Sequence, residues 1–242
     1  MSPDLVATEP PPPPGSGAMF DRIAGRYDLL NRLLSLGIDR RWRRRLVDAV
    51  PLLAGETLLD LATGTADVAI LAARVRPGVR VIGLDPSEAM LEVGRRKVAG
   101  AGLAARVELR HGDAQALPFP DASLAGATMA FGIRNVPDRP LALRELARVV
   151  RPGGRVAILE LADPPPGLLC AAARFHVHSV VPRLGAALSG APEYRYLHRS
   201  IAAFPPPERF VALLEEAGLR PLETVSLTFG VCQLFVAEPG RG

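Results

Sequence analysis

Leu58-Leu59-Asp60-Leu61-Ala62-Thr63-Gly64-Thr65-Ala66-Asp67 is the stretch that decides the fold. Its leucine-rich start is typical of a buried strand, and its Thr-Gly-Thr centre is typical of a tight loop. Apolar residues then recur at helical spacing, at Val68, Leu71, Ala72 and Val75. The stretch predicts a strand, a loop and the start of a helix. In an open parallel sheet such a junction lies at the carboxyl end of a strand, where ligands bind beside backbone amides.

The loop carries too few glycines for a dinucleotide. A dinucleotide site has three, in G-x-G-x-x-G, so that a pyrophosphate can approach the backbone, whereas only Gly64 is present here. The flanking Asp60 and Asp67 would repel a pyrophosphate but favour a ligand with an ammonium and a sulfonium, such as S-adenosylmethionine. Both carboxylates also have a structural interpretation, Asp60 as a hydrogen-bonded strand-end residue and Asp67 as a charge that complements a helix dipole.

The composition allows one substantial core. The chain has 242 residues, of which 48% are hydrophobic, and this is typical of a single domain. Its two cysteines, Cys170 and Cys232, lie far apart without metal-ligand spacing, so we expect no disulfide scaffold, no metal and a reducing, cytoplasmic compartment. The longest apolar region, residues 168–188, is interrupted by charged residues and proline. We therefore expect neither a secretion signal nor a membrane span.

The net charge of +4 comes from one early segment. Residues 19–50 contain eight arginines and four aspartates, while the rest of the chain has 21 basic and 21 acidic residues. A nucleic-acid surface needs a wider basic face with interleaved aromatic residues, so we expect no nucleic acid. The segment is interpreted either as a solvated helix face or as a contact with anionic lipid headgroups, with Trp42 near the interface. The arginines concerned are Arg40, Arg41, Arg43, Arg44 and Arg45.

The domain is expected to occupy residues 19–242. Residues 1–18 contain five consecutive prolines and predict an extended tail without a core. Residues 19–51 show apolar residues at helical spacing and predict two helices, the second capped by Asp39 and ending at Pro51. The sequence leaves the oligomeric state open, a homodimer included.

Alternating strands and helices follow. Ser87 is placed to cap the helix after the second strand, and a helix at 137–150 leads into Arg151-Pro152-Gly153-Gly154, which predicts a turn. This alternation is typical of a doubly wound α/β sheet. The predicted strands lie at residues 58–61, 79–84, 107–109, 124–131 and 156–161.

The alternation stops at residues 162–204. This segment is too long for a plain connector and predicts a helical lid over a pocket. A helix at 206–217 then leads to two final strands at 221–227 and 231–237. Because their connection is short, we expect an antiparallel pair.

Two strand ends carry aspartates that suit an adenosine. Asp85 follows the second strand about twenty residues beyond Gly64, where a carboxylate accepts the hydroxyls of a ribose. Its structural alternative is a turn or cap residue. Asp113 follows the third strand and is placed to accept from the amine of an adenine, with the backbone of Ala114 completing the contact.

Five blocks of the sequence resemble the demethylmenaquinone/2-methoxy-6-polyprenyl-1,4-benzoquinol C-methyltransferases of menaquinone and ubiquinone biosynthesis. Phe131-Gly132-Ile133-Arg134-Asn135 and the lid motif Tyr194-x-Tyr196-Leu197 are the more specific ones, whereas the loop at Gly64 is common to many methyltransferases. The resemblance runs from Met19 to the end of the chain. The blocks lie at residues 19–31, 59–65, 131–138, 151–154 and 189–205.

The resemblance implies a class I methyltransferase (Rossmann-like) fold with a seven-stranded, mostly parallel sheet whose last strand is antiparallel. It implies S-adenosylmethionine contacts at Thr65, Asp85, Asp113 and Ala114. To these we add residues from the loop and the first helix, where an aromatic ring is placed to close over the cofactor, although aromatic residues at helical spacing are also typical of a core. The added residues are Gly64, Asp60 and Tyr27.

Two positions depart from the family pattern. Ala66 stands where the family commonly has glycine, and Ala130 stands where many members have serine. The extra methyl of Ala66, in a loop that needs an unusual backbone angle, is expected to crowd the methionine end of the ligand and weaken its binding. Ala130 loses a hydroxyl and with it a polar contact.

The implied activity is S-adenosylmethionine-dependent C-methylation of a prenylated quinol, converting demethylmenaquinol to menaquinol, with the benzoquinol step of ubiquinone synthesis left open. Arg134 and Asn135 are the catalytic candidates, Arg134 to stabilise phenolate charge and hold a water, Asn135 to orient the ring. Arginine keeps its proton at neutral pH and is therefore a poor base, and His176 and His178 in the lid are candidates for that role. The pair also has a structural interpretation, as stabilisers of a turn.

Three alternatives remain. The chain could methylate another small aromatic molecule, bind NAD as an oxidoreductase of similar fold, or bind a ligand without catalysis. The missing glycines argue against the oxidoreductase.

Overall fold

The computed structural model describes most of the domain. The described residues are Phe20, Asp21, Ala24, Gly25, Asp28, Arg32, 35–164, Gly167 and 199–240. The predicted tail at residues 1–18, Tyr27, and all of the predicted lid between 168 and 198 lie outside them, as do His176 and His178.

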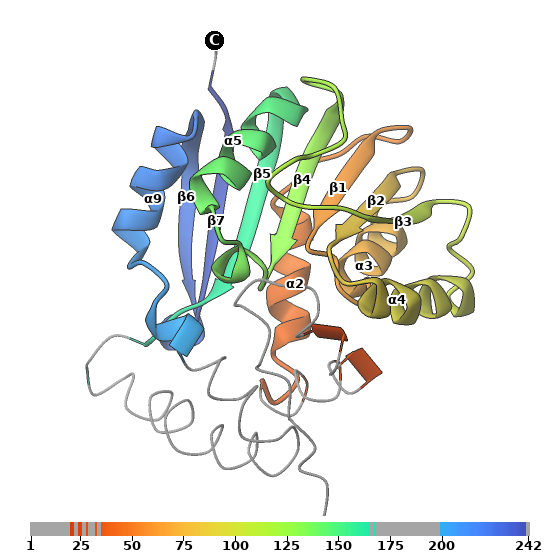
Figure 1. The fold of residues 1–242 in the computed structure, drawn as a ribbon, viewed down its shortest axis with the longest axis horizontal. Helices are drawn as coiled ribbons and strands as arrows, with labels where there is room; N and C mark the ends of the chain where they lie inside the picture. The colour runs from red at the N-terminus through yellow and green to blue at the C-terminus, as the bar shows by residue number, and fades with distance from the viewer. Residues whose placement is uncertain are drawn as a thin grey trace, which may run out of the picture.

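A seven-stranded sheet forms the centre of the described structure (Figure 1). Its order is β3-β2-β1-β4-β5-β7-β6, and β7 is antiparallel to both β5 and β6 whereas the pairs from β3 to β5 are parallel. The doubly wound sheet with an antiparallel last strand is therefore confirmed. The strands are β1 (Thr57–Leu61), β2 (Arg80–Asp85), β3 (Val107–His111), β4 (Leu124–Ala130), β5 (Val150–Leu161), β6 (Leu219–Leu227) and β7 (Cys232–Pro239).

Helices cover both faces of this sheet. Alternate residues of a strand point to opposite faces, so Leu59 of β1 packs among the side chains of α5 and α9 while Leu58 packs among those of α2 and α3. Two apolar cores result, one on each side of the sheet, as a doubly wound fold requires. The helices are α2 (Asp39–Asp48), α3 (Asp67–Val75), α4 (Glu88–Gly100), α5 (Arg139–Val149) and α9 (Pro207–Glu216), with short 3-10 turns η1 (Ile133–Asn135) and η3 (Thr228–Gly230).

Several element ends depart from the prediction, and α2 ends at Asp48 instead of at Pro51. Asp39 is the first helical residue of α2 instead of its cap, because its carboxylate accepts from Ser35 Oγ at 2.8 Å and pairs with Arg43. Residues 151–154 form part of β5 instead of a preceding turn, and the irregularity there is a shift in its register with β4. The cap at Ser87 is confirmed, since its Oγ accepts from Met90 N–H at 3.2 Å.

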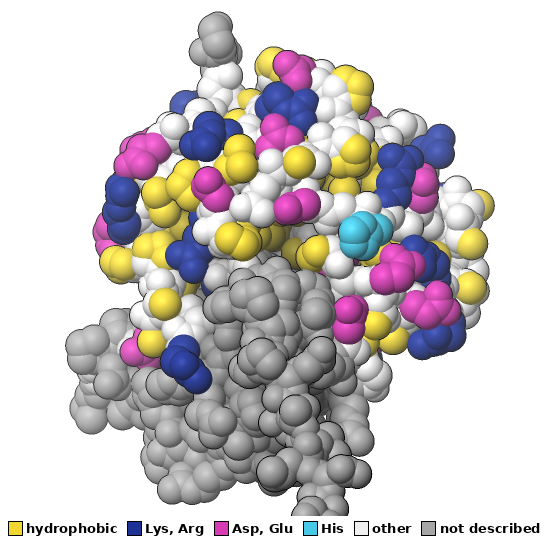
Figure 2. Space-filling view, viewed as in Figure 1, with side chains coloured by type: hydrophobic (Ala, Val, Ile, Leu, Met, Phe, Trp, Pro, Cys, Tyr) yellow, Lys and Arg dark blue, Asp and Glu magenta, His cyan; other side chains and the backbone are white. Residues whose placement is uncertain are grey.

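The arginines of α2 differ in their exposure to solvent. Trp42 is buried, and its Nε1–H donates to Thr228 Oγ1 at 2.9 Å, so the placement of Trp42 at a lipid interface is wrong. Arg43 is also buried, whereas the other four arginines of α2 are exposed. Acidic and basic side chains are interspersed with apolar ones over the described part of the face in Figure 2. Within the described ranges, no helix is long and apolar enough to cross a membrane.

Candidate functional site

A cavity of about 610 Å³ opens at the carboxyl edge of the parallel strands. It is lined by Gly64 after β1, Asp85 at the end of β2, Asp113 after β3, and Phe131 and Asn135 after β4. The volume is in the range of small-molecule sites. Four strand ends that are distant in the sequence thus form one site, at the place where ligands bind in open α/β sheets.

Asp85 presents a carboxylate that two loops hold in place. Its Oδ2 accepts the N–H of Gly64 at 2.8 Å and its Oδ1 accepts the N–H of Ser87 at 2.9 Å. Burial raises the pKa of the Asp85 carboxyl from its ordinary 3.8 to about 6, with a further rise from the charge of Asp21, while the two backbone bonds act in the opposite direction. The Asp85 carboxylate, which the sequence predicts to accept the ribose hydroxyls, therefore lies at the cavity wall with a fixed orientation.

Asp60 stabilises the loop after β1 through hydrogen bonds to its carboxylate. Its carboxylate accepts from Thr63 Oγ1 at 2.6 Å and from Thr128 Oγ1 at 2.9 Å, and it is 1% exposed. Burial raises the pKa of the Asp60 carboxyl to about 6. Asp60 is not among the residues that line the cavity, so the structure supports its structural interpretation over a contact with a cationic ligand.

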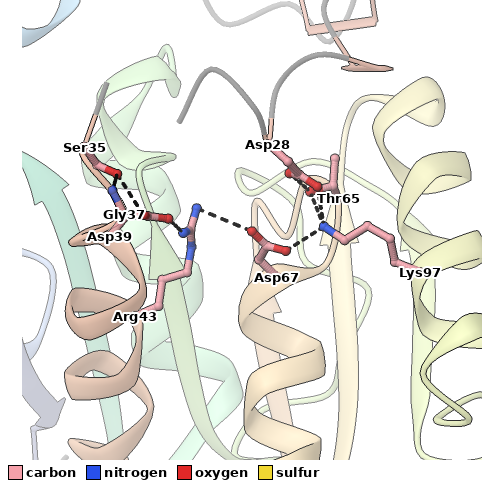
Figure 3. Close-up of polar contacts among 8 residues, drawn as sticks. All are labelled: Asp28, Ser35, Gly37, Asp39, Arg43, Thr65, Asp67 and Lys97. Atoms are coloured by element: carbon pink, nitrogen blue, oxygen red, sulfur yellow. Dashed lines mark hydrogen bonds and ion pairs between the residues drawn. The ribbon is translucent and has the colours of Figure 1, made fainter. Parts of the chain in front are cut away.

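Thr65 and Asp67 are not among the residues that line the cavity, and both side chains contact Lys97 of α4 (Figure 3). Lys97 donates to Asp67 Oδ1 at 2.6 Å, and Thr65 Oγ1 donates to Asp28 Oδ1 at 2.6 Å. Burial alone would raise the pKa of Asp67, but the Lys97 ammonium and, more weakly, Arg43 hold it below its ordinary value. Asp67 has a cationic partner within the chain and is not among the residues that line the cavity, which supports its structural interpretation over a contact with a cationic ligand.

Ala66 occupies a left-handed backbone conformation. Its φ is +67°, so this position does need an unusual backbone angle, which costs alanine about 1 kcal/mol relative to glycine. The side chain is fully buried and faces α4, where a Cβ added to Gly94 would lie 3.3 Å from that of Ala66. The predicted crowding of the ligand by this methyl is thus not seen. Ala130, in contrast, lines the cavity.

Asp113 and Ala114 lie together at the end of β3 and line the cavity. The Asp113 carboxylate accepts the N–H of Gln115 at 2.9 Å, which orients it. His111 lines the same wall, with its Nε2 3.1 Å from the carbonyl oxygen of Pro86. This wall combines acceptors with backbone groups, as the predicted adenine contact requires.

Arg134 and Asn135 lie in η1 with different surroundings. Asn135 lines the cavity, and its Nδ2 donates to the Phe131 carbonyl at 3.4 Å. Arg134 is buried and pairs with Glu160, which is 0% exposed, and its Nη1 donates to the Phe131 carbonyl at 2.9 Å. Arg134 is not among the residues that line the described cavity.

Glu160 and Lys97 are the functional candidates that the sequence reasoning missed. The signal for Glu160 was a carboxylate inside the apolar run of β5, which needs a partner when buried. Lys97 gave no signal beyond its place on α4, since its partners Asp28 and Asp67 are 69 and 30 residues away. Within the described part of the chain, no group of His, Cys, Asp or Glu residues could hold a metal ion.

Residues 16–238 match the ubiE/COQ5 methyltransferase family. The chain belongs to this family.

Curated members of the ubiE/COQ5 family resemble the chain over nearly its whole length. A demethylmenaquinone methyltransferase of Thermus thermophilus is 46% identical over 221 residues, which cover 91% of this chain and 99% of that protein. A ubiquinone/menaquinone biosynthesis C-methyltransferase UbiE of Geobacter sulfurreducens is 44% identical over 223 residues, which cover 92% of this chain and 87% of that protein. The resemblance read from the sequence motifs is thereby confirmed.

Solved structures confirm the class I methyltransferase fold. The [4+2]-cyclase SpnF superposes with a TM-score of 0.70 at 18% identity, covering 97% of this chain and 100% of that one. A SAM-dependent methyltransferase from Aquifex aeolicus superposes with a TM-score of 0.59 at 21% identity, covering 81% and 88%. At these identities the likeness shows the fold alone.

As a member of the ubiE/COQ5 family, the protein uses S-adenosylmethionine as its cofactor, and the residues of the cavity fit this molecule. Asp85 supplies a carboxylate for ribose hydroxyls, and Asp113 with Ala114 supplies acceptor and backbone groups for adenine. Gly132 lets the loop after β4 approach the loop after β1, because a Cβ at Gly132 would lie 2.5 Å from the Cβ of Ala62. The Phe131 to Asn135 block therefore lies beside the cofactor loop.

Proposed function

We propose that the protein transfers a methyl group from S-adenosylmethionine to a ring carbon of a prenylated quinol, converting demethylmenaquinol to menaquinol. The observation that carries the proposal is one cavity shared by the cofactor residues Gly64, Asp85 and Asp113 and by Phe131 and Asn135 of the family-specific block. The names of two relatives support this substrate, the Thermus protein and a demethylmenaquinone methyltransferase of Deinococcus radiodurans, which is 43% identical over 91% of this chain and 90% of its own length.

The chain's own residues have to prepare the ring. When bound, S-adenosylmethionine supplies an activated methyl group, so the protein's work is alignment and charge stabilisation. A quinol carbon becomes nucleophilic when the neighbouring hydroxyl loses its proton, because the phenolate shifts charge into the ring. Asn135, at the cavity wall, is the proposed group that orients this hydroxyl.

Arg134 is the proposed electrostatic partner of the phenolate. Its pairing with the buried Glu160 compensates its charge and fixes the guanidinium behind Phe131 and Asn135. In this position it stabilises the η1 turn directly, and its proposed effect on the phenolate acts across that turn. Arg134→Ala is expected to reduce kcat for demethylmenaquinol strongly, and full turnover by this variant would remove Arg134 from the mechanism.

The substrate is tested by following label from methyl-labelled S-adenosylmethionine. The protein is incubated separately with demethylmenaquinol and with a methoxy-benzoquinol, and the label is measured in the extracted lipid. We expect labelled menaquinol. Label in neither lipid, with normal cofactor binding, would favour a different small aromatic substrate.

We infer that the exposed arginines of α2 bring the protein from the cytoplasm to an anionic membrane surface, where a prenylated quinol resides. Arg40, Arg41 and Arg45 are exposed and face outward from α2, while Arg44 also pairs with Asp48 at 2.8 Å. Replacing the three by glutamine is expected to reduce co-sedimentation with vesicles of anionic lipid. Unchanged co-sedimentation would contradict the inference.

A further inference from the structure

A polar network joins the start of the domain to the cofactor loop (Figure 3). We call the described residues before α2, which include Phe20, Asp21, Asp28 and residues 35–38, the N-terminal segment. The network links this segment with α2, with the residues after Gly64 and with α4, through hydrogen bonds and ion pairs. Its side chains are those of Asp28, Ser35, Asp39, Arg43, Thr65, Asp67 and Lys97.

Lys97 is at the centre of the network. Its Nζ donates to Asp28 Oδ2 at 2.6 Å, to Asp67 Oδ1 at 2.6 Å and to Thr65 Oγ1 at 3.0 Å. An ammonium has three N–H donors, so these contacts match its full capacity. The three charged side chains are between 24% and 29% exposed, so water screens their attraction only in part.

Thr65 connects this centre to the cavity. Its hydroxyl donates to Asp28 Oδ1 at 2.6 Å while it accepts from Lys97. Its neighbour Gly64 lines the cavity and donates its N–H to Asp85. Asp28 is therefore held by Lys97 and by Thr65, and Thr65 is the residue next to Gly64 in the cavity wall.

Asp21 provides a second attachment of the N-terminal segment. Its Oδ1 accepts from Ser87 Oγ at 2.6 Å and from Ala89 N–H at 3.2 Å, at the start of α4. Its neighbour Phe20 lines the cavity. Because Asp21 contacts the start of α4 and Asp28 contacts Lys97 farther along it, α4 carries both attachments of a segment that supplies part of the cavity wall.

We propose that Lys97 is a positioning residue for cofactor binding, which fixes Asp28 against Thr65 and so keeps the loop at Gly64 and the cavity wall at Phe20 in place for the cofactor. Without the ammonium, the negative charges of Asp28 and Asp67 near Thr65 would lose their shared cation, and their repulsion favours displacement of Asp28. The inference rests on the cavity being the S-adenosylmethionine site and is independent of which quinol is methylated.

Lys97→Met keeps the aliphatic stem and removes the charge. Calorimetry with S-adenosylmethionine alone is expected to show a Kd about tenfold higher, the size for loss of a partly exposed charge network, while kcat at saturating cofactor stays within about twofold. Lys97→Arg is expected to restore part of the affinity. Arg96→Met is the matched control, because Arg96 is an exposed cation on the same helix that pairs with Glu92.

A double-mutant cycle tests whether Lys97 acts through Asp28. Asp28→Asn is expected to weaken cofactor binding, and the double variant is expected to bind within about twofold of Lys97→Met alone, because both changes break one contact. Additive losses would overturn the proposal, as would a wild-type Kd for Lys97→Met. If Lys97→Met fails to fold, Asp28→Asn carries the same test.

Hydrogen exchange on the cofactor-free protein tests the contact without any ligand. Peptides that contain Asp28 are expected to exchange faster in Lys97→Met than in wild type or Arg96→Met. Equal exchange in all three proteins would overturn the proposal. A wild-type protein that does not bind S-adenosylmethionine would instead refute the proposed function, and the exchange comparison would still decide the role of Lys97.

Discussion

Cofactor affinity is expected to depend on pH through Asp85. Burial raises the pKa of this carboxyl to about 6, so the free protein is mostly protonated there at pH 5 and mostly ionised at pH 7. Ribose hydroxyls donate to the ionised form and favour it. Only about one molecule in eleven is ionised at pH 5 when the pKa is about 6, so affinity should fall about tenfold from its plateau, or about 1.4 kcal/mol.

The assay is calorimetry with S-adenosylmethionine between pH 5 and 7, below the range in which the ligand's own amine titrates. Two buffers of different ionisation enthalpy report the protons released on binding, which should be close to one per site at pH 5. Asp85→Asn is expected to bind more weakly and without this pH dependence. Asp60→Asn is the matched control, because Asp60 has a similar pKa but does not line the cavity, so it should keep the dependence.

Two results would refute the reasoning. Wild-type affinity that is flat from pH 5 to 7 would mean that Asp85 does not receive the ribose hydroxyls. A tenfold change that persists in Asp85→Asn would mean that a group other than Asp85 causes the pH dependence.

Three further outcomes are expected. Because the pKa of Asp60 is raised, the protonated carboxyl contributes its full stability below about pH 4, and this contribution is lost as pH rises through about 6. The free energy of unfolding of Asp60→Asn in urea should therefore rise by up to about 3 kcal/mol relative to that of wild type between pH 4 and 8, and a constant difference would contradict the burial argument. Ala66→Gly should stabilise the protein by about 1 kcal/mol because it relieves a left-handed alanine, whereas the helical control Ala69→Gly should destabilise it, and equal effects would show that φ is not the cause. Trp42→Phe and Thr228→Val should each cost about 1 kcal/mol by breaking one hydrogen bond, with the double variant little worse than either, and full additivity would rule out their contact.

Much of the fold could be read from local pattern. Parallel strands buried on both faces appear as short apolar runs, so β1, β2 and β4 were placed within a residue or two of their ends. The strand-end positions of Gly64, Asp85 and Asp113 followed from the same runs, and the cavity brings these three residues together. The site was predictable to this extent because backbone topology alone carries strand ends to one edge.

The partners of the charged side chains were not predictable. Asp67 was interpreted as facing a cationic ligand, yet its cation is Lys97, 30 residues away. Arg134 was interpreted as facing the substrate, yet it pairs with Glu160, 26 residues away. A charge gives the same sequence signal whether a ligand, a solvent molecule or another side chain compensates it.

The sequence by itself determined the order of strands and helices, the family and the edge of the sheet where the cavity lies, because these depend on apolar spacing and on motifs contiguous in the chain. Only the tertiary structure decided that Trp42 is buried against Thr228, that Ala66 faces Gly94, and that Lys97 joins the N-terminal segment to the loop after β1. The physical reason is that burial and ion pairing are properties of neighbours in space. Such neighbours are brought together only when the two helical layers pack against the sheet.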